Sequence, residues 1–219
     1  MACRAPVATP DAACPNVPAA TLYDTQRAIA DYIDSGRYDA DFAAVAAAAR
    51  AWLEERAPQV QRPAIVLDID ETSLTNWPAY RANGWARILA GPCDLPAGPC
   101  GIRAWQGKAA SKALVPTLEL ARRARELGVA VFFITGREPS FRAATERNLR
   151  EQGYVWDGVV LLPPGAHFAH VADFKAPERR KIAERGYTIL LTMGDQQSDL
   201  DGGYAERTFK LPNPVYFLP

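Results

Sequence analysis

Three acidic residues stand at the end of an apolar stretch in AIVLDIDETSLTN, which spans residues 64–76. Asp68 and Asp70 are two positions apart, so on an extended strand their side chains point to the same side. Glu71 follows them directly. Unpaired buried charges cost much free energy, and neighbouring carboxylates repel each other unless a cation lies between them. The segment therefore predicts a site in which a cation compensates for the acids.

Polar residues also follow two later apolar runs. Thr135, Gly136 and Arg137 come at the end of VAVFFIT, and Asp195 and Asp199 follow TILLTMG. If the chain enters a helical turn after this last run, the two aspartates share one face. Each group thus adds oxygen donors or a positive charge at the end of a predicted strand.

The donor types favour a hard cation. Carboxylates without neighbouring cysteine or histidine suit Mg²⁺ first and Ca²⁺ second, and they do not suit Zn²⁺. The candidate metal ligands are Asp68, Asp70, Asp195 and Asp199.

The elements that must position these residues alternate along the chain. Short apolar runs rich in β-branched residues predict strands at PAIVLDI, VAVFFIT, GVVLLP and YTILLTM, with a short last strand expected at TFKLPN. Helical patterns lie between them over residues 114–127, 139–152 and 176–185. This alternation predicts an α/β fold, a Rossmann-like three-layer sandwich with a central parallel sheet. Ligands of such sheets bind beyond the carboxyl ends of the strands, where the polar groups would meet.

We expect one domain over residues 21–219, preceded by an N-terminal arm. Residues 1–20, rich in Ala and Pro, predict an extended arm. Residues 21–57 predict an N-terminal helical hairpin, with helices over 21–36 and 39–57. Residues 77–112, rich in Gly and Pro, predict a small irregular insertion after the first strand.

Composition narrows the classes of partner. The chain is 48% hydrophobic and 23% charged, which is typical of a globular protein. Its formal net charge of zero provides no basic field, so we expect no nucleic-acid partner. No apolar run approaches the roughly 20 residues of a membrane span. We expect a small-molecule substrate, and the sequence does not indicate an oligomeric state.

The cysteines bear on the compartment. Cys3, Cys14, Cys93 and Cys100 form two sequence-local pairs, which permits disulfides and an oxidising environment, although four free thiols are the alternative. Cys93 and Cys100 lie in the loop GPCDLPAGPCGI, and we predict a bridge between them. No apolar signal-peptide core follows the start. We expect an exported protein, periplasmic or lipid-anchored, whose export signal is missing from this sequence.

The motifs together resemble those of the haloacid dehalogenase (HAD) superfamily of phosphotransferases. Asp68 to Thr72 match the pattern Asp-x-Asp-x-Thr, Thr135 the second-strand threonine, and Lys175 in DFKAPERR the lysine of the third motif. The acidic pair after the last long strand matches the fourth motif. The wording LDIDETSLTNWP, FFITGRE and MGDQQSDL is similar to subfamily IIIB, which includes exported class B and lipoprotein acid phosphatases and plant vegetative storage proteins.

The resemblance implies Mg²⁺-dependent hydrolysis of phosphomonoesters through a phospho-aspartate. Asp68 would be the nucleophile, and Asp70 would protonate the leaving oxygen and later activate water. Thr135 would hold a phosphoryl oxygen, and Lys175 would orient Asp68 and neutralise the transferred group. The side chains of Asp68 and Asp195 and the main-chain carbonyl of Asp70 would bind Mg²⁺. Asp199 would support them.

Several residues are candidates for substrate contact. Gly136 and Arg137 follow the second strand, although Arg137 is equally explained as a surface charge beside a helix. Trp77 and Tyr80 lie in the insertion with Trp85 and Trp105, where aromatic rings stack on a nucleobase or phenol, or simply pack on the sheet. The substrate would be a nucleotide, sugar or aryl phosphate. We expect His167 and His170 to be ordinary loop residues.

Two other functions remain open at this point. A nucleotide-sugar transferase also carries an Asp-x-Asp metal motif, but that motif does not require TGR or the terminal acidic pair. A catalytically weak storage or binding protein on the HAD fold is the second, and the presence of Asp68 favours an enzyme over it. A P-loop NTPase is excluded because no G-x-x-x-x-G-K-[ST] motif occurs.

Overall fold

The computed structural model describes residues 20–165, 168 and 170–218, and a five-stranded sheet lies at its centre. The strands follow the order β5-β4-β1-β6-β7, and each neighbouring pair is parallel. Their bounds are β1 Pro63–Leu67, β4 Ala130–Ile134, β5 Gly158–Val160, β6 Thr188–Gly194 and β7 Arg207–Lys210. The predicted α/β fold with a central parallel sheet is confirmed.

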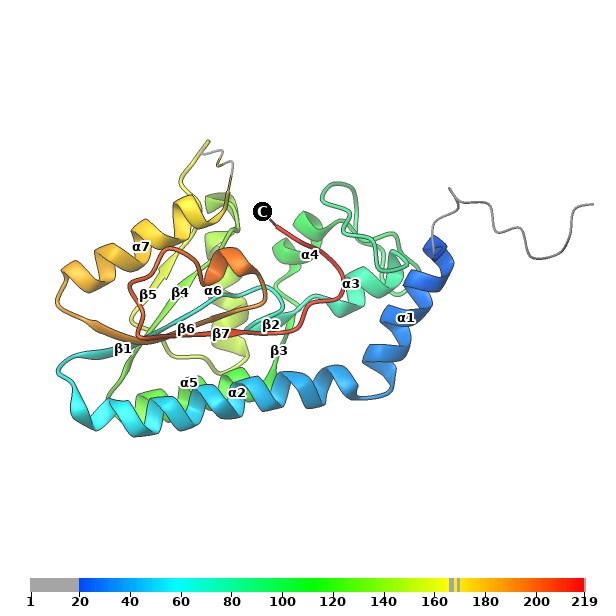
Figure 1. The fold of residues 1–219 in the computed structure, drawn as a ribbon. Helices are drawn as coiled ribbons and strands as arrows, with labels where there is room; N and C mark the ends of the chain where they lie inside the picture. Colours follow the sequence, from blue (N-terminus) through cyan, green and yellow to red (C-terminus); the bar gives the residue numbers. More distant parts are fainter. Residues whose placement is uncertain (1–19, 166–167, 169, 219) are drawn as a thin grey trace, which may run out of the picture.

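Helices cover both faces of this sheet and complete the predicted three layers (Figure 1). Buried apolar residues of α2, α5 and α6 cluster with one face, and those of α7 cluster with the other. Strand β1 serves both clusters: Ile65 and Leu67 belong to the first, Ala64 and Val66 to the second, because side chains alternate along a strand. The bounds are α2 Arg37–Arg56, α5 Val115–Glu126, α6 Arg142–Glu151 and α7 Ala172–Glu184.

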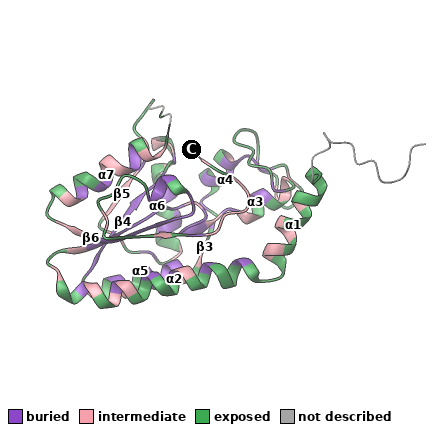
Figure 2. Ribbon diagram, viewed as in Figure 1, coloured by how far each residue is buried: buried purple, intermediate pink, exposed green. Residues whose placement is uncertain are grey.

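Burial explains why these strands have continuous apolar sequences. A strand covered on both faces has no side that contacts water, so alternation of polar and apolar residues is lost. Figure 2 shows buried strands in the middle of the molecule and exposed residues along the outer sides of α2 and α7. Three single-turn 3₁₀ helices connect the elements: η1 Ala57–Gln59, η2 Pro139–Phe141 and η3 Gln197–Asp199.

The two N-terminal helices form as predicted, but they do not lie side by side. Helix α1 (Leu22–Asp34) begins at a capping box between Thr21 and Asp24, and Gly36 with φ +77° separates it from α2. Figure 1 shows the helices meeting at a bend. Ile29 and Ile33 of α1 pack on the insertion, whereas α2 packs on the sheet and on α5. The N-terminal pair therefore joins the insertion to the sheet.

The segment predicted as irregular contains two short helices, α3 Trp77–Ala82 and α4 Ile102–Lys108. It is attached to the sheet by a small antiparallel pair, β2 Leu74–Thr75 with β3 Lys112–Ala113. Among the described residues, no helix is both long and apolar enough to cross a membrane.

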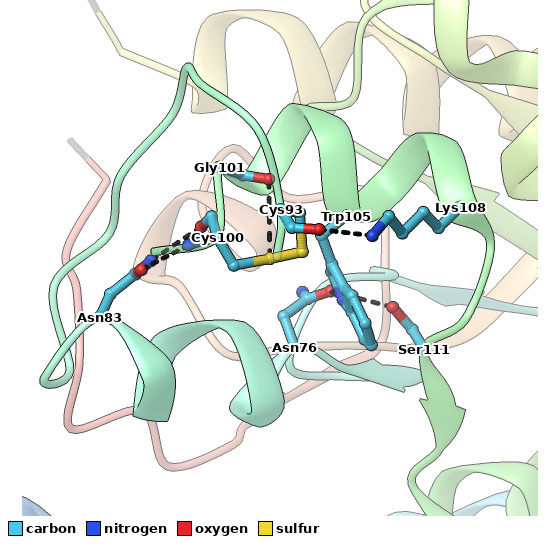
Figure 3. Close-up of a disulfide and its surroundings, with 8 residues drawn as sticks. All are labelled: Asn76, Asn83, Cys93, Cys100, Gly101, Trp105, Lys108 and Ser111. Atoms are coloured by element: carbon cyan, nitrogen blue, oxygen red, sulfur yellow. Dashed lines mark hydrogen bonds between the residues drawn. A yellow bond between two sulfur atoms is a disulfide. The ribbon is translucent and has the colours of Figure 1, made fainter. Parts of the chain in front are cut away.

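The predicted Cys93–Cys100 disulfide is present, and Figure 3 shows the hydrogen bonds around it. Asn83 bonds both the main-chain N–H and the carbonyl of Cys100, each at 2.8 Å. The Lys108 ammonium donates to the carbonyl of Cys93. The bridge thus closes the loop that leads into α4. Cys3, Cys14, His167 and nearly all of the predicted arm lie outside the described residues.

Candidate active site

The polar groups predicted at the strand ends do meet at one edge of the sheet. Strands β4, β1 and β6 are neighbours, and their carboxyl ends lead directly to Thr135, Asp68 and Asp195. A cavity of about 250 Å³ opens above these ends. Asp68, Asp70, Gly136, Arg137, Lys175, Asp195 and Asp199 all line it.

A buried lysine lies between two of the carboxylates. Lys175, in the first turns of α7, donates to Asp68 Oδ1 at 2.6 Å and also to Asp199 Oδ1. Burial acts to lower the pKa of Lys175, but the charges of Asp199 and Asp68 outweigh it and raise the pKa above its ordinary value. Lys175 therefore remains protonated and places a positive charge next to Asp68, the predicted nucleophile.

The carboxylates of Asp68, Asp195 and Asp199 lie close enough to share a cation. Each offers one oxygen, and these oxygens lie within 4.8 Å of one another. Burial raises the pKa of Asp68 well above its ordinary value, and burial with the charge of Asp199 raises that of Asp195 to about 6. Lys175 balances one of three negative charges. The oxygen donors fit a hard divalent cation, and such a cation would also balance the negative charge that Lys175 leaves uncompensated.

Local sequence explains how Asp199 reaches this cluster. A side chain at Gly194 would come within 2.2 Å of the Asp199 carboxylate, so only glycine permits the approach. The carbonyl of Asp199 accepts from the Arg179 guanidinium at 2.7 Å and from the Thr192 hydroxyl at 3.2 Å. Arg179 also donates to the carbonyls of Gly203 and Asp201. Arg179 of α7 is 1% exposed and holds the segment that carries Asp199. Sequence reasoning missed it because it stands in a charged run typical of a surface.

The second carboxylate of the motif is bound by an arginine. Arg137 donates through Nη2 to Asp70 Oδ1 at 2.7 Å and through Nε to Oδ2 at 3.1 Å, and Thr145 accepts from its Nη1. Burial acts to raise the pKa of Asp70, but Arg137 and the Asn76 amide outweigh it and hold the pKa below its ordinary value. Because Arg137 is buried, its explanation as a surface charge is wrong. It also lines the cavity, and its contact with a substrate stays a prediction.

Asn76 connects this pair to the insertion, and no feature of its type or spacing marked it in the sequence. Its amide donates to Asp70 at 2.8 Å and to Glu71 at 2.9 Å. Its carbonyl oxygen accepts from the Trp105 indole and the Ser111 hydroxyl, as Figure 3 shows. Glu71 is fully buried at φ +53°, and burial together with Asp70 raises its pKa well above the ordinary value.

The remaining expected contacts divide. Thr135 is buried, and its hydroxyl accepts from the Arg137 main-chain N–H at 3.2 Å. Tyr80 lines the cavity, but Trp77 does not. The Trp77 ring packs edge-on against Tyr38, Tyr80 and Trp85, which favours the packing alternative for this residue. His170 is exposed and is not among the lining residues.

Several plant proteins are similar to this chain in sequence. The Stem 28 kDa glycoprotein of Glycine max is 34% identical over 159 residues, which cover 70% of this chain and 59% of that protein. Acid phosphatase 1 of Solanum lycopersicum is 31% identical over 70% of this chain and 58% of its own length. Vegetative storage protein 2 of Arabidopsis thaliana is 31% identical, over 70% and 56%. The chain thus spans less than two thirds of the length of these relatives.

A solved structure shares the fold, and a family model covers almost the whole chain. The class C acid phosphatase from Bacillus anthracis superposes with a TM-score of 0.69 at 23% identity, covering 90% of this chain and 86% of its own. The model of HAD superfamily subfamily IIIB (acid phosphatase) matches residues 11–219. The chain therefore belongs to subfamily IIIB of the HAD superfamily.

Proposed function

We propose that this protein hydrolyses phosphomonoesters by transferring the phosphoryl group to Asp68 and then to water. The observation that carries the proposal is the buried Asp68–Lys175 contact of 2.6 Å at the floor of a cavity, beside a second carboxylate, Asp70. Phosphoryl transfer requires positioned groups and positive charge around the phosphoryl oxygens, and this arrangement supplies both. Membership of the acid phosphatase subfamily supports the same reaction.

Each residue has a part that follows from its position. The Asp68 carboxylate attacks phosphorus, and Lys175 orients it and offsets the charge of the incoming phosphate. Asp70 gives a proton to the leaving oxygen and later takes one from the attacking water. Arg137 and Asn76 hold Asp70 in place. The Thr135 hydroxyl holds a phosphoryl oxygen, and Gly136 next to it lines the cavity.

We further propose Mg²⁺ as the cation, held by the side chains of Asp68 and Asp195 and the main-chain carbonyl of Asp70, with Asp199 in support. A bound divalent cation supplies charge stabilisation of the phosphoryl oxygens. The Asp70 side chain is not one of the three carboxylates that lie within 4.8 Å of one another, so we assign it to proton transfer rather than to the cation. Membership of the subfamily and the uncompensated negative charge of the three carboxylates support this assignment.

The substrate we propose is a small nucleotide, sugar or aryl phosphate. Beyond the carboxylates the cavity is lined by Tyr80, Tyr216 and Ile102, with Arg87 and Arg103 at its side. Such a mixture suits a leaving group with an apolar ring and an anionic or polar portion. We propose that the protein is exported and is either periplasmic or lipid-anchored, and the Cys93–Cys100 disulfide supports export to an oxidising compartment.

A storage role is the second candidate, because relatives include proteins named for storage. The two functions differ in turnover. A screen of nucleotide, sugar and aryl phosphates should show release of inorganic phosphate, which chelation abolishes and Mg²⁺ restores. Asp68→Asn should release no phosphate with or without Mg²⁺. Absence of turnover with every substrate, in protein shown to bind Mg²⁺ by calorimetry, would leave storage or binding as the function. Full turnover in excess chelator would contradict the metal assignment alone.

A further inference from the structure

The C-terminal segment, residues 211–218, returns from the last strand to the active-site cavity. It leaves β7 at the edge of the sheet and ends close to α4, as Figure 1 shows. Tyr216 and Leu218 line the cavity. Tyr216 donates to the buried Glu71 at 3.3 Å. We call residues 211–218 the tail.

One side chain of the tail bonds in two directions. The Asn213 amide nitrogen donates to Asp195 Oδ2 at 2.6 Å. Its amide oxygen accepts from the main-chain N–H groups of Val215 at 2.8 Å and Tyr216 at 3.3 Å. The same amide therefore holds a candidate metal ligand and shapes the turn of the tail.

A second amide repeats this pattern next to it. Gln196 donates to Asp195 Oδ2 at 2.6 Å and to the carbonyl of Tyr216 at 3.4 Å, and its oxygen accepts from the N–H of Leu218 at 2.9 Å. Asp195 Oδ2 thus receives two short bonds. Within the described residues, Oδ1 receives one longer contact, from the Thr72 hydroxyl at 3.4 Å. The arrangement leaves Oδ1 with open acceptor capacity for a cation.

We propose that Asn213 is a positioning residue that fixes Asp195 for the divalent cation and thereby links cation binding to docking of the tail. This inference rests on the proposed function, because it takes Asp195 as a metal ligand. Partners that orient a ligand typically change metal affinity 10- to 100-fold when they are removed. Linkage is reciprocal, so the cation also holds the tail in place by the same factor.

The test measures Mg²⁺ binding rather than activity. Mg²⁺ is titrated calorimetrically into metal-free wild type, Asn213→Ser, Asn213→Ala and Phe217→Ala. The serine hydroxyl accepts from N–H groups two residues on, so it keeps much of the turn, but it is too short to reach Asp195. We expect about 10- to 100-fold weaker Mg²⁺ binding for both Asn213 variants. Phe217, a tail residue whose side chain is 72% exposed, is the matched control and should bind as wild type does.

Hydrogen exchange of the wild type gives a second readout that needs no variant. Mg²⁺ should slow exchange of the Val215, Tyr216 and Leu218 amides. Unchanged exchange at these amides, or equal Mg²⁺ affinity for wild type and Asn213→Ser, overturns the inference and leaves the proposed function intact. A wild type that binds no Mg²⁺ overturns the metal assignment itself and this inference with it. If Asn213→Ala does not fold, Asn213→Ser and the wild-type exchange decide.

Discussion

Arg137 holds Asp70 through two nitrogens, with Nη2 2.7 Å from Oδ1 and Nε 3.1 Å from Oδ2. Arg137 is 3% exposed, and its guanidinium also donates to the Thr145 hydroxyl. A planar fork fixes the plane of a carboxylate as well as its position. The orientation of Asp70, the proposed acid, therefore depends on a residue that follows the neighbouring strand, β4.

Arg137→Lys should retain the charge and lose this fixed orientation. We expect kcat to fall about 10- to 100-fold for alkyl phosphates, whose leaving oxygen needs a proton, and clearly less for a nitrophenyl ester. KM should change little, because the guanidinium is occupied by Asp70 rather than by phosphate. Rates measured against leaving-group pKa, for wild type and variant, check the prediction.

Arg142→Lys, at an exposed arginine on α6, is the control for this comparison. An equal loss for good and poor leaving groups, together with a large rise in KM, would mean that Arg137 binds the phosphate after all.

Asp68→Asn should fold and lose activity by a factor on the order of 10⁴ or more, since the amide keeps the shape of the nucleophile without its reactivity. The metal-free variant should be at least as stable as wild type, because one of three crowded carboxylates is gone while Lys175 keeps Asp199 as its partner. Phosphate release and thermal unfolding in chelator measure the two effects. Asp94→Asn, at an exposed loop aspartate, is the control. Near wild-type turnover would exclude Asp68 as nucleophile.

The sequence could predict Asp68, Thr135 and Asp195 because they follow neighbouring strands of a parallel sheet. Alternation of strands and helices specifies that their ends meet, and no knowledge of side-chain packing is needed. This logic does not locate Lys175, whose surroundings in the sequence are typical of a surface. Only the order of the family's motifs indicated it.

Residues that act through a returning segment could not be predicted in this way. Arg179 and Asn213 contact the site because α7 and the tail fold back on it, and nothing local in the sequence encodes those contacts. Trp77 shows that nearness in sequence does not decide between substrate contact and packing. It lies next to the motif in sequence, but its ring fills the space between Tyr38 and Trp85.

The stability of the metal-free protein should fall as the pH rises from about 4 to 7, in part through Asp195. Its pKa of about 6 in the folded state exceeds its ordinary value of 3.8, so between these values the folded state retains a proton that the unfolded state has lost. Stability from this group is present below the lower value and is lost through the upper one. The loss is on the order of 2 to 3 kcal/mol.

Urea unfolding of wild type and Asp195→Asn in chelator, across this pH range, isolates the effect. The two should converge at low pH and diverge as the pH rises, with the variant becoming relatively more stable. Saturating Mg²⁺ should remove the wild-type loss, because the cation replaces the proton. Parallel pH profiles for the two proteins would show that Asp195 is not protonated in the folded state.

The last prediction concerns the disulfide. Replacing both Cys93 and Cys100 by Ala should lower the free energy of unfolding by about 2 kcal/mol, since the bridge closes a short loop in the unfolded chain. The loop also leads into α4, whose Gln106 lies 3.5 Å from Asp70 and whose Arg103 lines the cavity. KM should therefore rise more than kcat falls, because Asp68 and Lys175 are held by the sheet and α7.

Urea unfolding with and without reductant, followed by steady-state kinetics, checks both parts. Reductant should lower the urea midpoint of the wild type to that of the double variant, because it breaks the Cys93–Cys100 bridge. The midpoint of the variant, which lacks this bridge, should not change. A wild-type midpoint that ignores reductant would mean that the bridge is not formed in the purified protein. A large fall in kcat with unchanged KM would mean that the loop acts on the Asp68 chemistry itself, and that the insertion does more than shape the wall of the cavity.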